Sequence, residues 1–312
     1  MDSTPSIRES LSPEPKVPYS CIICGSQPVS DEINGIAIWK CTICALMWRQ
    51  SFDVPISHYE DASGGFSKSK EFLQRRNIRD RIRTIGRDVS LDHTCDIGGS
   101  KGYFVEELLR SGYVGAYGID PNKTQVEAAS RSGIPMLVGS TADLHRIFPQ
   151  RETKNASFFH VIEHLPDPTT VMTEIYEALP DGGYLIVETP DFSSYSFKKL
   201  NYVHKLVYEE HLFYFSAENL QRFLTNRGFT IQKVCKRDFD QYHLNAREAL
   251  FRLGLMRREG FLPLWQKVLY KIATLLTTPL SLMVKFLKRN MYVLIIAKKP
   301  LVHSKTKFDR KG

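Results

Sequence analysis

Residues 208–216, Y-E-E-H-L-F-Y-F-S, place two carboxylates and an imidazole directly before a run of large apolar rings. An imidazole titrates near neutral pH and can remove a proton from a substrate, and a neighbouring carboxylate can orient it. One interpretation is therefore a catalytic pair at the rim of a dry pocket. The other is structural: the rings pack in the core, Ser216 caps the next helix and the charges face water.

Four of the six cysteines form two close pairs, C-I-I-C and C-T-I-C. Two thiolate pairs on two turns can converge into a tetrahedral site, so the spacing predicts Zn²⁺ bound by Cys21, Cys24, Cys41 and Cys44. Four protein thiolates leave no open position for catalysis, which makes the zinc structural. Four unrelated buried thiols are the alternative, but they do not explain the repeated spacing.

A glycine-rich turn follows a short apolar strand in T-C-D-I-G-G-S-K-G, residues 94–102. Glycines let a ligand approach the backbone closely, and the start of the following helix offers free N–H groups. About twenty residues further on, G-I-D-P-N ends a second strand at Asp120, where an acid can accept hydrogen bonds from ribose hydroxyls. A helix N-cap is the alternative role for Asp120.

The segments that must position these residues alternate between strands and helices. M-L-V-G-S-T, A-S-F-F-H-V-I and G-Y-L-I-V-E-T have the apolar, β-branched character of further strands, and helical patterns separate them. This alternation predicts an α/β fold with a doubly wound parallel sheet. Along the chain we expect a disordered leader, a zinc-binding module, a helical linker, a main domain with a helical insertion, and a disordered tail, at residues 1–18, 19–50, 51–90, 91–300 (insertion 240–289) and 301–312.

Three more motifs accompany the glycine turn: H-V-I-E-H-L-P-D-P, L-P-D-G-G-Y-L-I-V-E-T-P and M-Y-V-L-I-I-A-K-K-P. Together with D-I-G-G-S-K-G they resemble class I S-adenosylmethionine-dependent methyltransferases, although Ser100 stands where that family usually has glycine. The resemblance implies a Rossmann-like, mainly parallel seven-stranded sheet and S-adenosylmethionine as cofactor. It implies that the amino acid part of the cofactor contacts Asp96, Gly98, Gly99 and Gly102, that Asp120 holds the ribose, and that the turn at Ser140, Thr141 and Ala142 lies near the adenine.

Residues 208–216 also resemble the Y-H-E-H-x-x-Y-F-S segment of deoxysugar C-methyltransferases, which carry an N-terminal cysteine zinc module of their own. The resemblance implies that Tyr208, Glu210 and His211 are catalytic, with His211 as the base. Glu209 departs from that pattern, and the further C-terminal domain of those enzymes is not found in this chain. The expected acceptor is a small molecule, such as a sugar nucleotide or a lipid-linked sugar.

Other functions stay open. H-V-I-E-H together with His211 resembles the metal site of small-RNA 2′-O-methyltransferases and of some quinone O-methyltransferases, with the candidate ligands His160, Glu163, His164 and His211. That resemblance implies metal-assisted O-methylation or RNA methylation. A nearly neutral loop inside the cysteine module argues against nucleic acid. A cofactor-binding adaptor without activity is the non-enzymatic alternative.

Two amphipathic stretches complete the sequence. In residues 68–87, Ile78, Ile82 and Ile85 share one helical face, and we expect the arginines on the other face, either as an ordinary surface or as a phosphate-facing patch. Residues 262–289 are apolar with spaced lysines, and the thirteen uncharged residues between Lys271 and Lys285 fall short of the ~20 that span a bilayer. A lid, a dimer contact or a peripheral membrane contact would each fit. The net charge of +8 permits an anionic partner. With no apolar leader, we expect a cytoplasmic, reducing location, with membrane association and oligomeric state left open.

Overall fold

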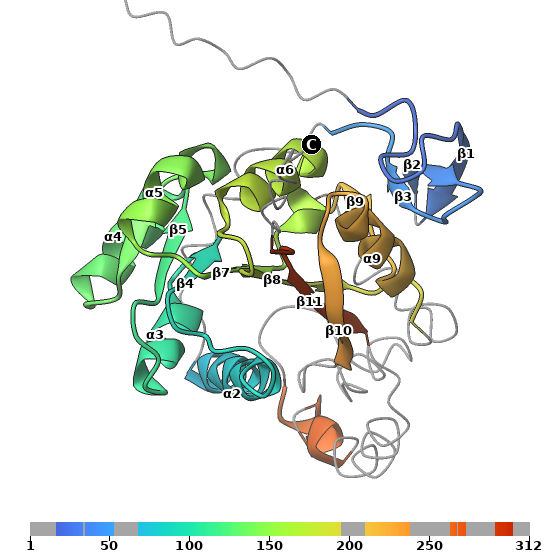
Figure 1. The fold of residues 1–312 in the computed structure, drawn as a ribbon. Coiled ribbons are helices and arrows are strands. Elements are labelled where there is room, and N and C mark those ends of the chain that lie inside the picture. The colour runs from blue at the N-terminus through green and yellow to red at the C-terminus, as the bar shows by residue number, and fades with distance from the viewer. Residues whose placement is uncertain are drawn as a thin grey trace, which may run out of the picture.

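A seven-stranded sheet forms the centre of the molecule (Figure 1). The computed structural model describes residues 17–33, 35–52, 68–194, 210–237, 263–266, 268–272 and 291–301 of the 312-residue chain. The strands of the sheet lie in the order β10-β11-β8-β7-β4-β5-β6. Their bounds are Thr94–Ile97 (β4), Tyr117–Asp120 (β5), Met136–Val138 (β6), Asn155–Phe159 (β7), Tyr184–Pro190 (β8), Thr230–Arg237 (β10) and Tyr292–Lys298 (β11).

The five strands β4 to β8 run parallel to one another, whereas β11 is antiparallel to both β8 and β10. Every residue of β4 and β5 is buried. Parallel strands that helices cover on both faces need apolar side chains on both faces, which is why these segments read as short apolar runs in the sequence. The predicted Rossmann-like, mainly parallel seven-stranded sheet is confirmed.

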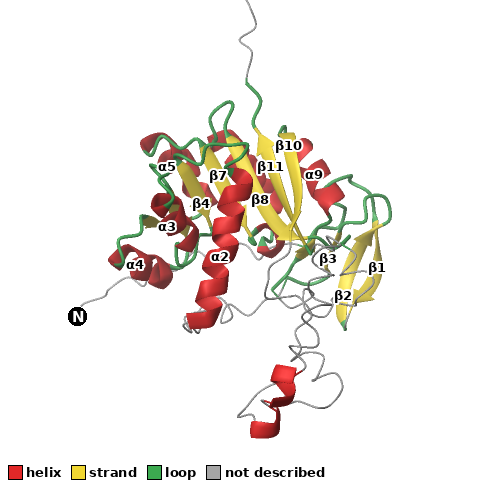
Figure 2. Cartoon of the chain, turned by 90° about the horizontal axis from the view of Figure 1, so that it is seen from below, coloured by secondary structure: helices red, strands yellow, loops and turns green. Residues whose placement is uncertain are grey.

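Helices cover both faces of this sheet (Figures 1 and 2). One apolar cluster packs α2, α3 and α4 on one face, and a second packs α5, α6 and α9 on the other. The helices span Lys68–Ile85 (α2), Tyr103–Arg110 (α3), Lys123–Arg131 (α4), Leu144–Gln150 (α5), Pro168–Ala178 (α6) and Ala217–Thr225 (α9), and two short 3-10 turns span Thr141–Asp143 (η2) and Ile162–His164 (η3).

Side-chain caps begin three of these helices. The side chains of Asn122, Asp167 and Ser216 accept hydrogen bonds from backbone N–H groups in the first turns of α4, α6 and α9. At α9 the predicted boundaries are confirmed, because Ser216 caps the start and Gly228, just past the end, has a φ of 93°. Such caps satisfy N–H groups that have no partner inside the helix.

A second, smaller sheet carries the cysteine pairs. It consists of β1 (Pro28–Ile33), β2 (Ile36–Cys41) and β3 (Met47–Arg49), all antiparallel, and of one strand from far along the chain, β9 (Phe213–Tyr214). The strand β2 contains the apolar segment I-A-I-W-K, which lies between the two cysteine pairs. The strand β9 belongs to the Y-E-E-H-L-F-Y-F-S segment, so that segment joins the cysteine module to the main domain.

Burial in α2 differs from the sequence expectation. Ile78, Ile82 and Ile85 are buried as expected. Arg81 is not on the outward face: it is 7% exposed, it pairs with the buried Glu188, and its guanidinium lies 4.2 Å from the centre of the Phe159 ring. A long arginine side chain can reach past the apolar stripe to a buried acid, which periodicity alone does not reveal.

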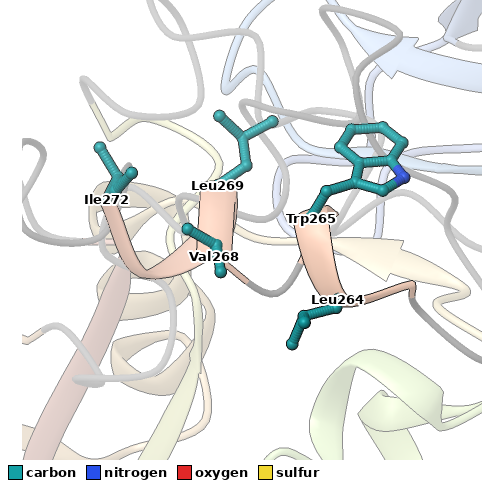
Figure 3. Close-up of a pocket in the computed structure, with 5 residues that line it drawn as sticks. All are labelled: Leu264, Trp265, Val268, Leu269 and Ile272. Atoms are coloured by element: carbon teal, nitrogen blue, oxygen red, sulfur yellow. The ribbon is translucent and has the colours of Figure 1, made fainter.

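The insertion predicted at residues 240–289 lies largely outside the described residues. Its described part, residues 263–266 and 268–272, includes two helical stretches. Leu264, Trp265, Val268 and Ile272 are exposed there, and together with Leu269 they line one apolar hollow (Figure 3). Within the described parts of the chain, no helix has the length and apolar character needed to cross a membrane. The lid, the dimer contact and the peripheral membrane contact through residues 262–289 stay predictions.

Candidate active site

The glycine-rich turn joins β4 to α3 at the carboxyl edge of the sheet. Gly98 and Gly102 have φ angles of 74° and 72°, in the left-handed region that favours glycine. A Cβ on Gly98 would lie 2.6 Å from Cγ2 of Val161, and one on Gly102 would lie 2.8 Å from Cγ2 of Ile134. Close packing inside the protein therefore requires both glycines, in addition to any ligand.

Ser100 also adopts a left-handed conformation, with a φ of 50°. This is the position where the resembling family usually has glycine, and a side chain there costs roughly 1–2 kcal/mol of backbone strain. Its hydroxyl donates to the side-chain oxygen of Gln125 on α4, so the substitution gains a contact that glycine could not make.

The amides of the turn are already used inside the protein. Gly98, Gly99, Ser100 and Gly102 all donate their N–H groups to protein oxygens: respectively the Ile119 carbonyl (2.9 Å), the same carbonyl (3.2 Å), Asp120 Oδ2 (2.8 Å) and the Gly99 carbonyl (2.9 Å). A phosphate-binding turn points such amides at its ligand. These four amides could bind a phosphate only by giving up their bonds inside the protein.

Asp120 ends β5 beside this turn. Its two carboxylate oxygens accept from the N–H groups of Ser100 and Asn122, each at 2.8 Å. Each oxygen keeps a further lone pair for a ribose hydroxyl. The side chain that caps α4 belongs to Asn122, so Asp120 does not have the alternative role of helix N-cap.

The turn at Ser140 lies next to Asp120, because the N–H of Gly139 donates to the Asp120 carbonyl at 3.2 Å. The Ser140 N–H donates to Asp143 Oδ2 at 3.0 Å, which fixes the turn that holds Thr141. Both residues expected near the adenine thus lie at the same edge as the residue expected at the ribose.

Asp96 is a buried carboxylate beneath the glycine turn, 4% exposed. Burial raises its pKa to about 7, although the Ser157 hydroxyl, which donates to Oδ1 at 2.6 Å, and the charge of Arg81 both act in the opposite direction. Its other oxygen, Oδ2, lies near Gly99, since a Cβ on that glycine would be 3.1 Å away. A cation bound at the turn would favour the ionised form of Asp96.

His211 meets a buried acid and a second histidine at the other half of this edge. Ligand atoms of Glu163, His164 and His211 all lie within 4.8 Å of one another. The rings of His164 and His211 are 4.7 Å apart at 67°. His164 Nδ1 lies 2.8 Å from the Glu210 carbonyl oxygen; a ring nitrogen facing a carbonyl donates, which leaves Nε2 of His164 as the acceptor.

Glu163 is fully buried yet ionised. Burial alone would raise its pKa, but the ion pair with His160 and the nearby His164 and His211 lower it. Thr189 donates its hydroxyl to Oε2 at 2.9 Å. A fixed carboxylate next to an imidazole stabilises that imidazole once it has taken a proton.

His160 bridges two buried acids rather than joining this group. Its Nδ1 lies 3.4 Å from Glu163 Oε1 and its Nε2 lies 3.2 Å from Glu188 Oε1. Burial lowers the pKa of His160, but these two carboxylates outweigh it and raise the pKa to about 9. A protonated imidazole has no lone pair for a metal, so His160 is the least suitable of the four candidate metal ligands.

The four paired cysteines converge as their spacing predicts. The Sγ atoms of Cys21 and Cys44 are 3.4 Å apart, as are those of Cys24 and Cys41, and all four lie within 4.8 Å of one another. A tetrahedral zinc–thiolate site with bonds of about 2.3 Å requires sulfur separations of about 3.8 Å. The described thiols are free of disulfides.

Both cysteine pairs sit on similar backbone turns. Gly25 and Ala45 follow the second cysteine of each pair with φ angles of 71° and 58°, and each donates its N–H to the carbonyl of the first cysteine of its pair. Burial raises the pKa of Cys41, but hydrogen bonds from the Cys44 N–H and the Ser26 hydroxyl outweigh burial and lower it to about 6. This turn therefore favours the thiolate, the form that binds a metal, at Cys41, whereas burial raises the pKa of Cys21 and of Cys44.

Comparison with known proteins adds to this geometry. A family described as a methyltransferase domain matches residues 69–234, which is more than half of the chain. The chain belongs to this methyltransferase-domain family. No curated protein sequence matches the chain.

Several solved structures of methyltransferases are similar to the chain. An S-adenosylmethionine-dependent methyltransferase from Archaeoglobus fulgidus is 16% identical over 79% of this chain and 100% of its own, with a TM-score of 0.49. One from Thermotoga maritima is 18% identical over 78% of this chain and 95% of its own, with a TM-score of 0.46. Magnesium protoporphyrin IX methyltransferase from Synechocystis is 10% identical over 78% of this chain and 94% of its own, with a TM-score of 0.47.

The protein is thus an S-adenosylmethionine-dependent methyltransferase, as the sequence motifs implied. The residues that the sequence analysis proposed for the cofactor, from Asp96 to Thr141, lie at one edge of the sheet. The sequence motifs grouped Glu163 with His211 only as candidate ligands of one metal, and pointed to Glu210 rather than Glu163 as the acid on the catalytic segment. Tyr208 lies outside the described residues.

We expect Asp120→Ala to weaken cofactor binding about tenfold or more in this methyltransferase, because the ribose loses a charged acceptor and the Ser100 N–H loses its partner. Calorimetric titration with S-adenosylhomocysteine measures this. Glu127→Ala, which removes an exposed acid on α4, serves as the control. An unchanged affinity in Asp120→Ala would refute the ribose role.

We also expect cofactor affinity to depend on pH through Asp96. The amino acid part of the cofactor carries an ammonium group, which favours the ionised carboxylate, so protonation of Asp96 below its pKa of about 7 opposes binding. Affinity should fall ~5-fold from pH 7.5 to pH 6, after allowing for the titration of the ligand's own amino group. In Asp96→Asn, affinity should be weaker at pH 7.5 and should lack this slope; a slope that persists would point to another group.

Proposed function

We propose that this methyltransferase modifies a small-molecule acceptor, a sugar or glycoconjugate, at an oxygen or carbon atom, with His211 as the general base. The observation that carries the proposal is the contact group of the buried Glu163 and His211 with the half-buried His164, near the glycine turn. Val161, which packs on Gly98, lies two residues from Glu163 and so ties this group to that turn.

The chemistry asks little of the protein. S-adenosylmethionine supplies a methyl group that is already strongly electrophilic. The acceptor atom forms a bond to the methyl carbon while the carbon–sulfur bond breaks, and the acceptor proton moves to the His211 imidazole. Glu163, held ionised by its neighbours, stabilises the imidazolium that results. In this proposal Glu210 and Tyr208 flank the base on its own segment.

The polar character of the site supports a hydroxyl-rich acceptor. His160, Glu163, His164 and Glu188 concentrate hydrogen-bonding groups at the ends of β7 and β8. The resemblance of residues 208–216 to deoxysugar C-methyltransferases points the same way. A sugar nucleotide and a lipid-linked sugar both fit this class of acceptor.

One alternative has an observation of its own. Because three candidate ligands lie within 4.8 Å of one another, a divalent ion at Glu163, His164 and His211 could lower the pKa of an acceptor hydroxyl. RNA methylation has less support. Two of the arginines that suggested a phosphate-facing patch are paired with acids: Arg75 with Glu71 and Glu106, and Arg79 with Glu107.

We propose that the cysteine module holds one structural Zn²⁺. Metal analysis of the purified protein should find about one zinc per chain, and Cys41→Ser should lower that content. Cys235→Ser is the matched control, since Cys235 lies on β10, outside the module. Full zinc content in Cys41→Ser would contradict the site.

We expect His211→Ala to lower turnover by about 10²–10⁴-fold, because the acceptor proton loses its base, while cofactor affinity stays within a few-fold. Release of S-adenosylhomocysteine with a panel of sugar nucleotides and lipid-linked sugars measures turnover.

His145→Ala, at a half-exposed histidine on α5, is the matched control and should behave like the parent enzyme. Turnover that survives in His211→Ala would move the base elsewhere. Activity that a chelator abolishes while zinc is retained, and that a divalent ion restores, would favour the metal-assisted alternative.

A further inference from the structure

A strand from the active-site segment, β9, pairs with the β3 edge of the cysteine module. Trp48 pairs with Phe213 and Met47 with Tyr214 across β3 and β9. The module and β9 thereby form one continuous four-stranded sheet, although 163 residues separate Arg49 from Phe213 along the chain.

Leu212 links this sheet to the candidate base. Its carbonyl accepts from the Arg49 N–H of the module at 2.9 Å, and its N–H donates to the Glu163 carbonyl of the active site at 2.8 Å. The two polar groups of one residue are thus divided between the two parts of the protein. His211 is the residue directly before this link, so its position follows from both bonds.

Side chains strengthen the same junction. The rings of Phe52 and Phe213 are 5.6 Å apart in an edge-to-face arrangement. On the neighbouring helix, the Asn226 side-chain amide donates to the Ile23 carbonyl at 2.8 Å, inside the first cysteine turn. Trp48 and Phe213 are fully buried between the two parts.

We infer that the cysteine module positions the catalytic base: its sheet captures β9 and thereby holds His211 against Glu163 and His164. This inference rests on the proposed role of His211. A strand of two residues has too few ladder bonds to hold itself, so it takes its position from what it pairs with. Phe52 and Asn226 are positioning residues, because they act through β9 and α9 rather than on a substrate.

The cofactor half of the enzyme has no such dependence. The turn at residues 98–102 and Asp120 belong to β4, β5 and α3, and none of these strands pairs with the module. Loosening the module should therefore disturb the acceptor side and leave cofactor binding intact. A merely stabilising module would weaken both sides together.

Hydrogen exchange of the full-length protein tests this. In Phe52→Ala and Asn226→Ala, and in protein stripped of metal by a chelator, amides in residues 210–216 should exchange about tenfold faster than in the parent. The ring ¹⁵N signals of His211, identified by their absence in His211→Gln, should shift. Affinity for S-adenosylhomocysteine should stay within about twofold.

Matched variants separate positioning from general loosening. Val29→Ala, at an exposed site on the distant edge strand β1, and Thr225→Ala, next to Asn226, should leave residues 210–216 unchanged. Phe52→Leu should restore most of the protection that Phe52→Ala loses. If Phe52→Ala fails to bind the cofactor at all, Asn226→Ala decides the question.

The inference is overturned if residues 210–216 keep their exchange rates and His211 keeps its ring signals in Asn226→Ala and in metal-stripped protein. These readouts do not depend on turnover. Unimpaired turnover of His211→Ala would therefore refute the base role separately, with the measured link between module and β9 unaffected.

Discussion

Buried carboxylates at the carboxyl edge of the central sheet are the constraint on which this enzyme depends. Asp96, Glu163 and Glu188 are all at most 4% exposed, and an ion in such a place is costly unless cations or hydrogen bonds surround it. Glu188 forms ion pairs with Arg81 and His160, and Glu163 forms an ion pair with His160 and accepts a hydrogen bond from Thr189. Asp96 accepts a hydrogen bond from the Ser157 hydroxyl and is otherwise stabilised only by the more distant charge of Arg81, so its pKa stays raised. The least compensated of the three acids is the one beneath the cofactor turn.

The same edge divides into two halves with different construction. The cofactor half is made of consecutive strand–turn–helix units. Backbone N–H groups of these units donate to carbonyls within the same units, so the half is complete within a short stretch of chain. The acceptor half brings together η3, the end of β8 and the segment before β9, and it closes against the N-terminal module. A conserved type of ligand suits the first kind of construction, whereas a variable acceptor suits the second.

The sequence was sufficient for features that repeat locally. Strand–helix alternation predicted the sheet, and two identical cysteine spacings predicted four converging thiols. It could not predict the pairing of β3 with β9, because a two-residue strand has no periodicity and backbone bonds leave no mark in residue type. It misplaced Arg81, because helical periodicity assigns a polar residue to the exposed face and does not reveal that the buried Glu188 pairs with it. It also had no means to expect a left-handed Ala45, since alanine rarely adopts that conformation.

The pairing of β10 with β11 has a consequence for how this chain could change over time. Arg237 lies opposite Tyr292, so the stretch of sequence between them leaves the sheet and returns to it at the same place. Its length is therefore geometrically independent of the strand order. Descendants of such a chain could lengthen, shorten or exchange that stretch and keep the strand order of the central sheet.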